Sequence, residues 1–368
     1  MKLSGIELRV IEMPLVSPFR TSFGVATARE ALLVRAVTDE AEGWGEGVAM
    51  ADPLYSSEYV EASVDVITRF LLPALARVPD LDASRVGPAL AKFKGHRMSK
   101  AAVELALLDA ELRARGVPLS RELGAVRSQV DCGVSVGIMD SIPALLDAVG
   151  DYLDEGYVRI KLKIELGWDV EPVRAVRERF GDDVLLQVDA NTAYHRGDAG
   201  HLARLDPFDL LLIEQPLDEE DLLGHAQLAK AVRTPICLDE SIVSARAAAD
   251  AIALGACSIV NIKPGRVGGY LEARRIHDVC AANDIPVWCG GMLETGIGRA
   301  ANVALAALPG FTLPGDTSGS NRYYTRDITD PFVIENGTLT VPTGPGIGVT
   351  PTAEALEEVT VRTEWITF

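Results

Sequence analysis

Polar residues recur at a regular interval through the middle of the chain, each near the end of an apolar stretch. The successive gaps between them are 28, 26, 25, 25 and 24 residues. The residues with this spacing are Ser135, Lys163, Asp189, Glu214, Asp239 and Lys263. Each gap has the length of one strand, one helix and their connections, so the interval places these side chains at the same end of successive parallel strands.

Three members of this series are carboxylates, namely Asp189 in LLQVDAN, Glu214 in LLIEQP and Asp239 in ICLDES. A single carboxylate at such a position could equally hold an arginine or cap the next helix. Three of them at one end of neighbouring strands repel one another unless a cation neutralises their charge. Because all three offer oxygen ligands, which suit hard ions, we expect Mg²⁺ or Mn²⁺ at this position.

Lysines flank the carboxylates in the series. Lys161 and Lys163 alternate within VRIKLKI, which turns both side chains to the same face of the strand, and Lys263 follows the sixth strand. Burial and neighbouring positive charge lower the pKa of a lysine, which would let Lys163 act as a base near neutral pH. Two such bases on either side of a metal-bound carboxylate suit removal of the proton beside that carboxylate, because the charge that develops on its oxygens is stabilised.

The series requires alternating strands and helices from residue 132 onward. We predict strands at 133–137, 157–164, 184–191, 210–216, 235–241, 259–265 and 286–292, with an eighth near 314. Helices at 171–180 and 244–255 belong to the covering layer. Eight parallel strands on one period predict an α/β fold with a TIM-type (β/α)7β barrel. A doubly wound open sheet is the alternative, but the turn GVSVGIMDS lacks the GxGxxG loop of that fold.

The first third of the chain has a different pattern. Strands at 2–15, 31–38 and 43–49 precede helices at 57–72 and 98–115, which predicts an α+β unit. The regular interval ends near residue 318, where a tail rich in Pro, Gly and Thr begins. We therefore expect an α+β capping domain over 1–127, the barrel with the catalytic site over 128–317, and a C-terminal segment over 318–368 that completes the capping domain.

Charge and composition restrict the partners of the protein. With 35 Lys and Arg against 53 Asp and Glu, the net charge is −18, which argues against a nucleic-acid or membrane partner. The five cysteines form no CxxC pair, so neither a disulfide framework nor a zinc site is indicated. The N-terminal stretch, with Glu7 and Glu12, lacks the apolar core of a secretion signal. We expect a cytoplasmic homo-oligomer that acts on a small carboxylate.

The motifs around these residues resemble those of the enolase superfamily, in its muconate-lactonising-enzyme subgroup. Within it, the chain is most similar to the family of o-succinylbenzoate synthases and N-succinylamino acid racemases, also called N-acylamino acid racemases. The resemblance extends over essentially the whole chain. Its motifs are FRTSFG, GWGE, KFKGHRM, GVSVGIMD, RIKLKIE, QVDANTAY, LLIEQPL, CLDES, NIKPGRVGGY, CGGMLETGIGRAAN and LPGDTS.

The resemblance implies a role for each matching residue. Lys163 and Lys263 would be the acid/base pair, Lys161 would hold the substrate carboxylate, and Asp189, Glu214 and Asp239 would bind Mg²⁺ or Mn²⁺. Behind the metal, Glu240 would lie near Lys263 and Asn191 would order the site. The residues expected to face the substrate from the barrel mouth are Ser135, Gly291, Met292 and Glu294. Those expected to close over it from the capping domain are Phe19, Phe23, Met50 and Tyr55.

Two reactions use this acid/base set in the family. One is the dehydration that forms o-succinylbenzoate in menaquinone biosynthesis, and the other is racemisation of N-succinylamino acids. RIKLKIE and CGGMLETG favour a racemase that also has synthase activity, and a dedicated synthase is the first alternative. A dipeptide epimerase would carry Asp-x-Asp where LPGDTS has one aspartate, and a mandelate-racemase-type enzyme would need a histidine in PVWCGGM.

Other interpretations rank below these. Muconate cycloisomerisation stays open. A catalytically silent barrel that binds a small acid would have lost a base or a ligand, and none is lost here. A phosphate-binding barrel would use the glycines of KPGRVGG (263–269), but these more simply let the backbone turn beside Lys263.

Overall fold

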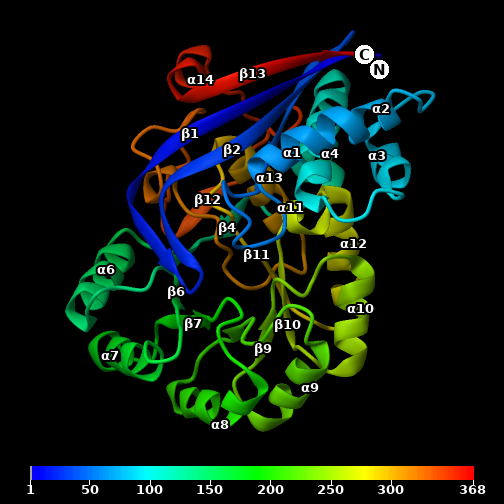
Figure 1. Cartoon of the computed structure of the whole chain (residues 1–368). Coiled ribbons are helices and arrows are strands. Elements are labelled where there is room, and N and C mark those ends of the chain that lie inside the picture. Colours follow the sequence, from blue (N-terminus) through cyan, green and yellow to red (C-terminus); the bar gives the residue numbers. More distant parts are fainter. Residues whose placement is uncertain (1) are drawn as a thin grey trace.

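The computed structural model describes residues 2–368, which form two large sheets and one two-stranded sheet, with helices around them (Figure 1). The first sheet is antiparallel with the strand order β13-β1-β2-β3. Its strands are β1 (Leu3–Thr21), β2 (Gly24–Thr38), β3 (Glu42–Gly47) and, from the other end of the chain, β13 (Thr360–Thr367). We call it the cap sheet.

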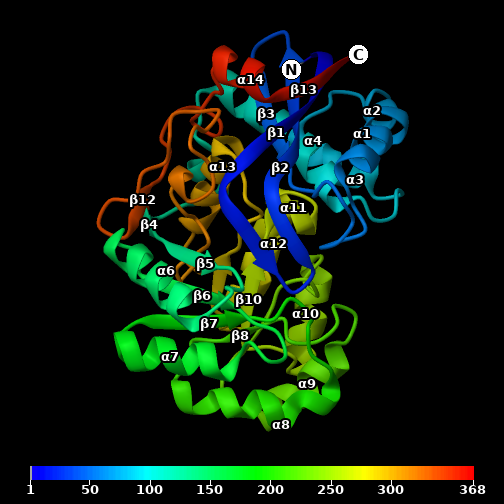
Figure 2. The same ribbon diagram turned by 60° about the vertical axis from the view of Figure 1, so that its left-hand side comes forward.

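The hairpin of β1 and β2 is longer than predicted. Its register shifts between Pro14 and Phe19, and beyond that shift the two strands continue to the turn at Gly24. Residues 16–28 lack a regular apolar alternation, which is why the sequence did not show them as strands. This distal part leaves the cap sheet and runs down to the second sheet, where the N–H of Ile138 donates to the carbonyl of Arg20 at 3.0 Å (Figure 2).

Helices cover one face of the cap sheet. They are α1 (Val60–Val66), the π-helical turn η1 (Ile67–Leu71), α2 (Leu72–Leu75), α3 (Ala83–Leu90) and α4 (Arg97–Arg115). The next helix, α5 (Leu119–Leu123), packs against α13 of the second part of the chain. The helix predicted at 57–72 is thus the α-helix α1, which continues as the wider π-helical turn η1 before Pro73. The ring nitrogen of Pro73 carries no hydrogen to donate to the preceding turn. The predicted helix at 98–115 corresponds to α4, which ends at Gly116 in the left-handed conformation.

Two glycines bring α4 onto the sheet. A Cβ atom added to Gly43 would lie 2.1 Å from the backbone nitrogen of Ala110, and one added to Gly45 would lie 2.1 Å from the carbonyl oxygen of Ala102. The Gly-Trp-Gly of β3 therefore serves the close packing of α4 on the strand.

The second sheet is parallel, and its seven strands lie in chain order. They are β5 (Gly133–Val136), β6 (Arg159–Lys163), β7 (Leu185–Asp189), β8 (Ile213–Glu214), β9 (Ile236–Leu238), β10 (Ile259–Ile262) and β11 (Val287–Cys289). Each coincides with a predicted strand and is shorter than it. Lys163 pairs with Asp189, and Asp189 with Glu214, so the register sets the polar strand ends side by side.

Helices separate these strands and lie on the outer face of the curled sheet (Figures 1 and 2). They are α6 (Ile142–Asp154), α7 (Val170–Phe180), α8 (Ala199–Leu202) between η2 (Arg196–Asp198) and η3 (Ala203–Phe208), α9 (Leu222–Ala231), α10 (Ala245–Leu254), α11 (Pro264–Val267), α12 (Tyr270–Ala281) and α13 (Gly296–Ala306). Side chains at their N-termini accept backbone N–H groups, as Ser141, Asp169 and Ser244 do. No helix among residues 2–368 is long and apolar enough to cross a membrane.

One segment contacts both edges of the parallel sheet. Phe311 forms a parallel bridge with Val287 of β11, and Gly315 forms one with Cys132, which precedes β5. The carbonyl of Gly315 also accepts the N–H of Gly133 at 2.7 Å. After this segment come η4 (Ser320–Arg322), then β12 (Thr338–Thr340), which pairs with β4 (Gln129–Asp131), then α14 (Ala353–Val359), and finally β13 beside β1.

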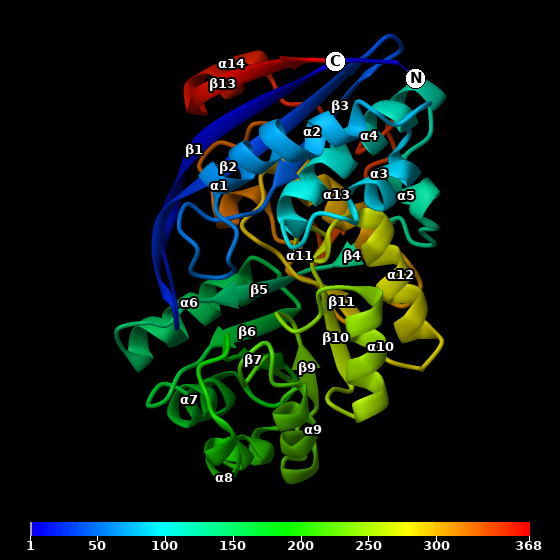
Figure 3. The same ribbon diagram turned by 45° about the vertical axis from the view of Figure 1, so that its right-hand side comes forward.

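Two buried carboxylates tie the cap sheet and its helices to the parallel part. Glu46 of β3 accepts the N–H of Thr295 at 3.0 Å, the Thr295 hydroxyl at 2.7 Å and the N–H of Gly298 at 2.9 Å, all at the start of α13. Glu104 of α4 accepts the N–H of Leu271 at 3.1 Å, in the first turn of α12. Figure 3 shows α4 and α12 on the same side of the molecule. Burial raises the pKa of each of these carboxyls to about 7.

Candidate active site

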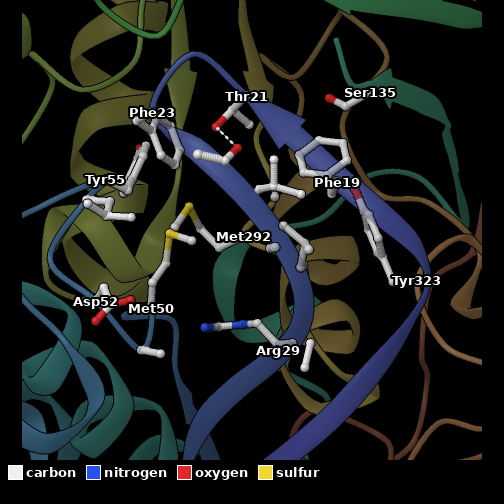
Figure 4. A pocket seen from close by; sticks show the side chains of 18 of the residues that line it. Phe19, Thr21, Phe23, Arg29, Met50, Asp52, Tyr55, Ser135, Met292 and Tyr323 are labelled. Atoms are coloured by element: carbon white, nitrogen blue, oxygen red, sulfur yellow. Dashed lines mark hydrogen bonds between the residues drawn. The ribbon is translucent and has the colours of Figure 1, made fainter. Parts of the chain in front are cut away.

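A cavity of about 300 Å³ lies between the distal hairpin and the carboxyl ends of the parallel strands (Figure 4). The hairpin contributes Phe19 and Phe23, and the loop after β3 contributes Met50 and Tyr55. The polar wall comes from the strand ends, which supply Ser135, Lys161, Lys163, Asn191 and Lys263. The cavity thus has an apolar upper part and a cationic floor, an arrangement that suits an anionic molecule with an apolar portion.

Lys161 and Lys163 lie next to each other on β6, and both side chains are buried. The Nζ of Lys163 donates to Asp189 Oδ2 and to Asn191 Oδ1, at 2.6 Å each. The Nζ of Lys161 donates to Glu214 Oε2 at 3.1 Å and lies 3.4 Å from Asp189 Oδ2. The alternation in VRIKLKI does turn both lysines to the same side, as the sequence indicates.

Lys263 enters the cavity from the end of β10, which is separated from β6 by three other strands. Its Nζ donates to Asp239 Oδ2 at 2.8 Å and to the hydroxyl of Tyr55 at 3.2 Å. The same ammonium lies 4.7 Å from the centre of the Tyr55 ring. A residue of the loop after β3 therefore contacts a lysine at the end of a strand of the parallel sheet.

The carboxylates change the electrostatics that the sequence suggested for the lysines. Burial alone would lower the pKa of Lys161, but the carboxylates of Asp316, Glu214 and Asp189 outweigh it and raise that pKa. Burial likewise lowers the pKa of Lys263, and Tyr55, Glu240 and the other carboxylates raise it above its usual value. Burial and neighbouring ammonium groups, the two effects evident from the sequence, are therefore outweighed at Lys161 and Lys263 by groups that the fold brings close in space.

The two central carboxylates respond in opposite ways. Burial raises the pKa of Asp189, but the ammonium groups of Lys163 and Lys161 outweigh burial and hold the pKa at about 2. The pKa of Glu214 is raised, first by burial and then by the charge of Asp189. The buried charge of Glu214 is compensated by the ammonium of Lys161 and by the amide of Asn261, whose Nδ2 donates to Glu214 Oε1 at 2.6 Å.

Asn191 and Glu240 form a link behind the cavity floor. Asn191 accepts Lys163 through Oδ1 and donates through Nδ2 to Glu240 Oε1 at 2.9 Å. Burial raises the pKa of Glu240 to about 7, and the charge of Asp189 adds to the shift. Among the described residues, Glu240 Oε2 has no hydrogen-bond partner.

Asp316 belongs to the site and was not among the predicted site residues. Its Oδ2 accepts Lys161 Nζ at 2.7 Å, and its Oδ1 accepts Arg159 at 2.8 Å. The spacing could have found it, because the series continues from Lys263 to Cys289 in 26 residues and from Cys289 to Asp316 in 27.

The remaining predicted residues divide into two groups. Gly291, Met292, Phe19, Phe23, Met50 and Tyr55 line the cavity with Ser135. Glu294 is not one of the lining residues of the described chain: its Oε2 accepts the N–H of Met292 at 2.8 Å, and its Oε1 accepts Asn302 Nδ2 at 2.9 Å. Its carboxylate is therefore engaged in holding the turn that presents Met292.

The donor set at the cavity floor suits a hard divalent cation, because Asp189, Glu214 and Asp239 offer only oxygen. Within residues 2–368, however, no three metal-binding side chains lie together as a ready-made ligand cluster. Asp189 and Glu214 are adjacent on β7 and β8, and each of the three carboxylates contacts a lysine Nζ. The side chains fit such an ion by their chemistry, and sharing one ion would require them to exchange these lysine contacts for it.

Known protein families match nearly the whole chain. Residues 5–124 match the mandelate racemase / muconate lactonizing enzyme N-terminal domain, and residues 144–355 match the enolase C-terminal domain-like family. The N-succinylamino acid racemase of Amycolatopsis sp. is 72% identical over 366 residues, which cover 100% of both chains. The o-succinylbenzoate synthase of Geobacillus kaustophilus is 47% identical over 93% of this chain and 91% of that protein.

A solved structure agrees with these matches. The structure of an enolase superfamily member from Listeria innocua has a TM-score of 0.95 and 40% identity, and the match covers 100% of this chain and 99% of that one. The matches thus extend over both the cap with its helices and the parallel sheet. The chain belongs to the enolase superfamily, with a mandelate racemase / muconate lactonizing enzyme N-terminal domain and an enolase-like C-terminal domain.

Proposed function

We propose that the protein removes the proton beside the carboxylate of an N-succinylamino acid, or a related N-acylamino acid, and returns it on either face. The observation that carries this proposal is the pair of lysines, Lys163 and Lys263, which line one cavity from strands separated by three others. The relatives from Amycolatopsis and from Thermus thermophilus, at 72% and 46% identity, are N-succinylamino acid racemases.

The proton would move between the substrate carbon and the two lysine nitrogens. One lysine, as the free amine, would take the α-proton, while the other, as the ammonium, would give a proton to the opposite face of the planar intermediate. Reversing the two roles would convert the other enantiomer. Lys161, whose pKa is raised by three carboxylates, would stay an ammonium and hold the substrate carboxylate.

We further propose that Asp189, Glu214 and Asp239 hold Mg²⁺, or Mn²⁺, as the family pattern implies. When bound, the ion would neutralise charge that develops on the substrate carboxylate oxygens. Glu240 and Asn191 would keep Lys163 in place from behind. Ser135, Gly291 and Met292 would contact the substrate from the strand ends, and Phe19, Phe23, Met50 and Tyr55 would cover its apolar part.

We also propose the finer architecture. The segment 311–315, which contacts both edges of the parallel sheet, would be the eighth strand of a (β/α)7β barrel. The barrel would extend over 128–317, and residues 1–127 together with 318–368 would form the capping domain. The pairing of β13 with β1 supports the return of the C-terminal segment to the cap.

The formation of o-succinylbenzoate is a second candidate activity. It requires the same proton removal beside a carboxylate, followed by loss of water, so Lys163, Lys263 and the carboxylates would serve it without change. Relatives at 47% and 44% identity are o-succinylbenzoate synthases. A protein with both activities, or a dedicated synthase, is compatible with this site.

Proton exchange in D₂O tests the proposal. With Mg²⁺ or Mn²⁺, N-succinyl-L-phenylalanine and its D-enantiomer should each exchange the α-proton and lose optical rotation. Lys163→Ala and Lys263→Ala should each abolish racemisation, and the singly substituted proteins should differ in which enantiomer still exchanges. Product formation from the cyclohexadiene precursor without any α-exchange would identify a dedicated synthase. Full racemase activity in both lysine variants would rule out the proposed acid/base pair.

A further inference from the structure

Tyr194 is a buried tyrosine whose hydroxyl joins two connections of the parallel sheet. It lies in the connection after β7 and is 1% exposed. Its hydroxyl donates at 2.9 Å to Oδ2 of Asp169, which ends the connection between β6 and α7. Lys163 ends β6, and Asn191, which accepts its ammonium, follows β7. The Tyr194 hydroxyl therefore links the two connections that begin beside these site residues.

The acceptor of this hydroxyl is itself held in place. Oδ1 of Asp169 accepts the N–H of Val170 in the first turn of α7 at 2.6 Å, and Oδ2 lies 2.7 Å from Nε2 of His201 in α8. The two helices lie side by side (Figures 1 and 2). Because an ionised carboxylate only accepts hydrogen bonds, we assign the hydrogen between them to Nε2. The His201 ring also stacks on the Tyr194 ring, with 26° between their planes.

The backbone that precedes Tyr194 is strained. Asn191 and Thr192 have φ angles of 41° and 65°, in the left-handed region that residues other than glycine rarely adopt. Thr192 is β-branched, which makes this conformation less favourable still. Two such residues in succession persist only where the surroundings hold them. Here the N–H of Tyr194 donates to the carbonyl of Pro216 at 3.0 Å, and its hydroxyl adds a side-chain anchor at Asp169.

The strained turn presents the side chain of Asn191 to Lys163. Oδ1 of Asn191 accepts the lysine Nζ at 2.6 Å. The backbone pairing of β6 with β7 ends next to this contact, where the N–H of Ile164 donates to the carbonyl of Asp189 at 2.9 Å. The contact between Lys163 and Asn191 thus lies between that backbone bond and the hydrogen bond of the Tyr194 hydroxyl. Without the hydroxyl, the strained turn would be free to relax and to carry Asn191 away from the lysine.

We propose that Tyr194 is a positioning residue for Lys163. Its hydroxyl, anchored at Asp169, keeps Asn191 in the conformation that accepts the lysine ammonium. This role rests on the proposed function, in which Lys163 carries one of the two proton transfers. Lys263 is held by hydrogen bonds to groups outside this turn, so loss of the hydroxyl should slow proton transfer on one face of the substrate only.

Tyr194→Phe tests this role, because it removes the hydroxyl and keeps the ring that stacks on His201. Exchange in Lys163→Ala and Lys263→Ala first identifies the enantiomer whose α-proton faces Lys163. In Tyr194→Phe the kcat for exchange of that enantiomer in D₂O should fall about tenfold, and the kcat for the other should stay within about twofold. Equal slowing of both enantiomers, or slowing of neither, would overturn the proposal.

Tyr157→Phe is the matched control. Tyr157 is also buried, and its hydroxyl has no hydrogen-bond partner among residues 2–368, so its removal should leave both exchange rates unchanged. Asn191→Gly then separates positioning from a general loss of stability, because glycine tolerates the left-handed φ at this position. In the Asn191→Gly protein, Tyr194→Phe should slow exchange no further. A full additional effect of Tyr194→Phe in that background would contradict action through Asn191.

A structural measurement tests the geometry without any activity. Crystal structures of the wild type and of Tyr194→Phe, grown under the same conditions, should differ in the distance from Asn191 Oδ1 to Lys163 Nζ. We expect a hydrogen bond in the wild type and a separation beyond hydrogen-bonding range in the variant. An unchanged distance would refute the positioning role whatever the substrate is. A wild type that exchanges neither enantiomer would refute the proposed function instead, and the two structures would still decide the role of Tyr194.

Discussion

The hydroxyl of Tyr55 lies 3.2 Å from the Nζ of Lys263, although the tyrosine comes from the loop after β3 and the lysine from the end of β10. The same hydroxyl lies 3.3 Å from Asp239 Oδ2, so it bridges the lysine and its carboxylate partner. A residue that covers the cavity therefore also fixes the position of one of the two proposed proton carriers, whereas the hydrogen bonds of Lys163 found among residues 2–368 go to Asp189 and Asn191 of the parallel part.

Tyr55→Phe should slow only the proton transfer that uses Lys263. The variant keeps the ring under the Lys263 ammonium and loses the hydrogen bond, so exchange of the α-proton that faces Lys263 should slow by about tenfold, or about 1.4 kcal/mol in the barrier. The enantiomer whose proton faces Lys163 should exchange almost as in the wild type. NMR of exchange in D₂O with each enantiomer measures both rates. Tyr59→Phe, outside the cavity, is the matched control, and equal slowing of both enantiomers in Tyr55→Phe would contradict the prediction.

Asp316→Asn should weaken the electrostatic stabilisation of the Lys161 ammonium. The aspartate raises the pKa of Lys161 and pairs with Arg159, so its loss leaves two buried cations with less compensation. We expect kcat/KM to fall by about ten- to a hundredfold, which corresponds to about 1.4–2.7 kcal/mol. Activity should also be lost at a lower pH on the alkaline side, since Lys161 would release its proton earlier. Asp140→Asn, an exposed aspartate beyond β5, should leave the pH profile unchanged; an unchanged profile in Asp316→Asn would refute the assigned role.

Gly290→Ala should displace Lys263. A Cβ atom at Gly290 would lie 2.3 Å from Asn261 Oδ1 and 2.7 Å from Lys263 Cε, so these side chains must move. We expect activity to fall at least tenfold, with a lower Tm, because Asn261 also holds Glu214. Gly200→Ala, where an added Cβ meets nothing within 4 Å, is the control for both measurements. Wild-type activity in Gly290→Ala would show that Lys263 has more room than the structure gives it.

Glu46→Gln should change how stability depends on pH. The pKa of Glu46 is raised from 4.5 to about 7 by burial, so the folded chain binds a proton that the unfolded chain releases between these values. The contribution of this carboxyl to stability is therefore fully present below about pH 4.5 and is lost as pH rises towards 7. In Glu46→Gln the fall in the free energy of unfolding between about pH 5 and 7 should be shallower. Urea unfolding at several pH values measures it, and Glu104 accounts for part of the remaining slope. An identical slope in both proteins would contradict the assignment.

The sequence was most informative where polarity and spacing coincide. Asp189 and Glu214 end strands whose other residues are apolar, and a parallel register leaves such ends side by side, so the interval alone located the cavity floor. The same reasoning placed Lys161 and Lys163 on one face. These are consequences of strand geometry that hold before any side-chain packing is known.

Other features depend on contacts that no local pattern records. The hairpin between Phe19 and Gly24 is held by partners more than a hundred residues away, such as the carbonyl of Asn191, which accepts the Ser22 hydroxyl. Glu294 lies in a motif at the mouth of the cavity, yet its carboxylate is engaged by a backbone N–H two residues earlier. The pKa direction of Lys263 likewise depended on which carboxylates surround it in space.

Glu104 and Glu46 accept backbone N–H groups in the first turns of α12 and α13, and these contacts have a consequence for the evolution of this protein. Because these hydrogen bonds tie β3 and α4 to the starts of α13 and α12, we expect admission of a substrate to depend mainly on the distal hairpin that overhangs the cavity. That hairpin is remote from the lysines in sequence and shares no strand with them. Substitutions there can alter which acyl group or side chain is accepted while the proton chemistry beneath stays the same.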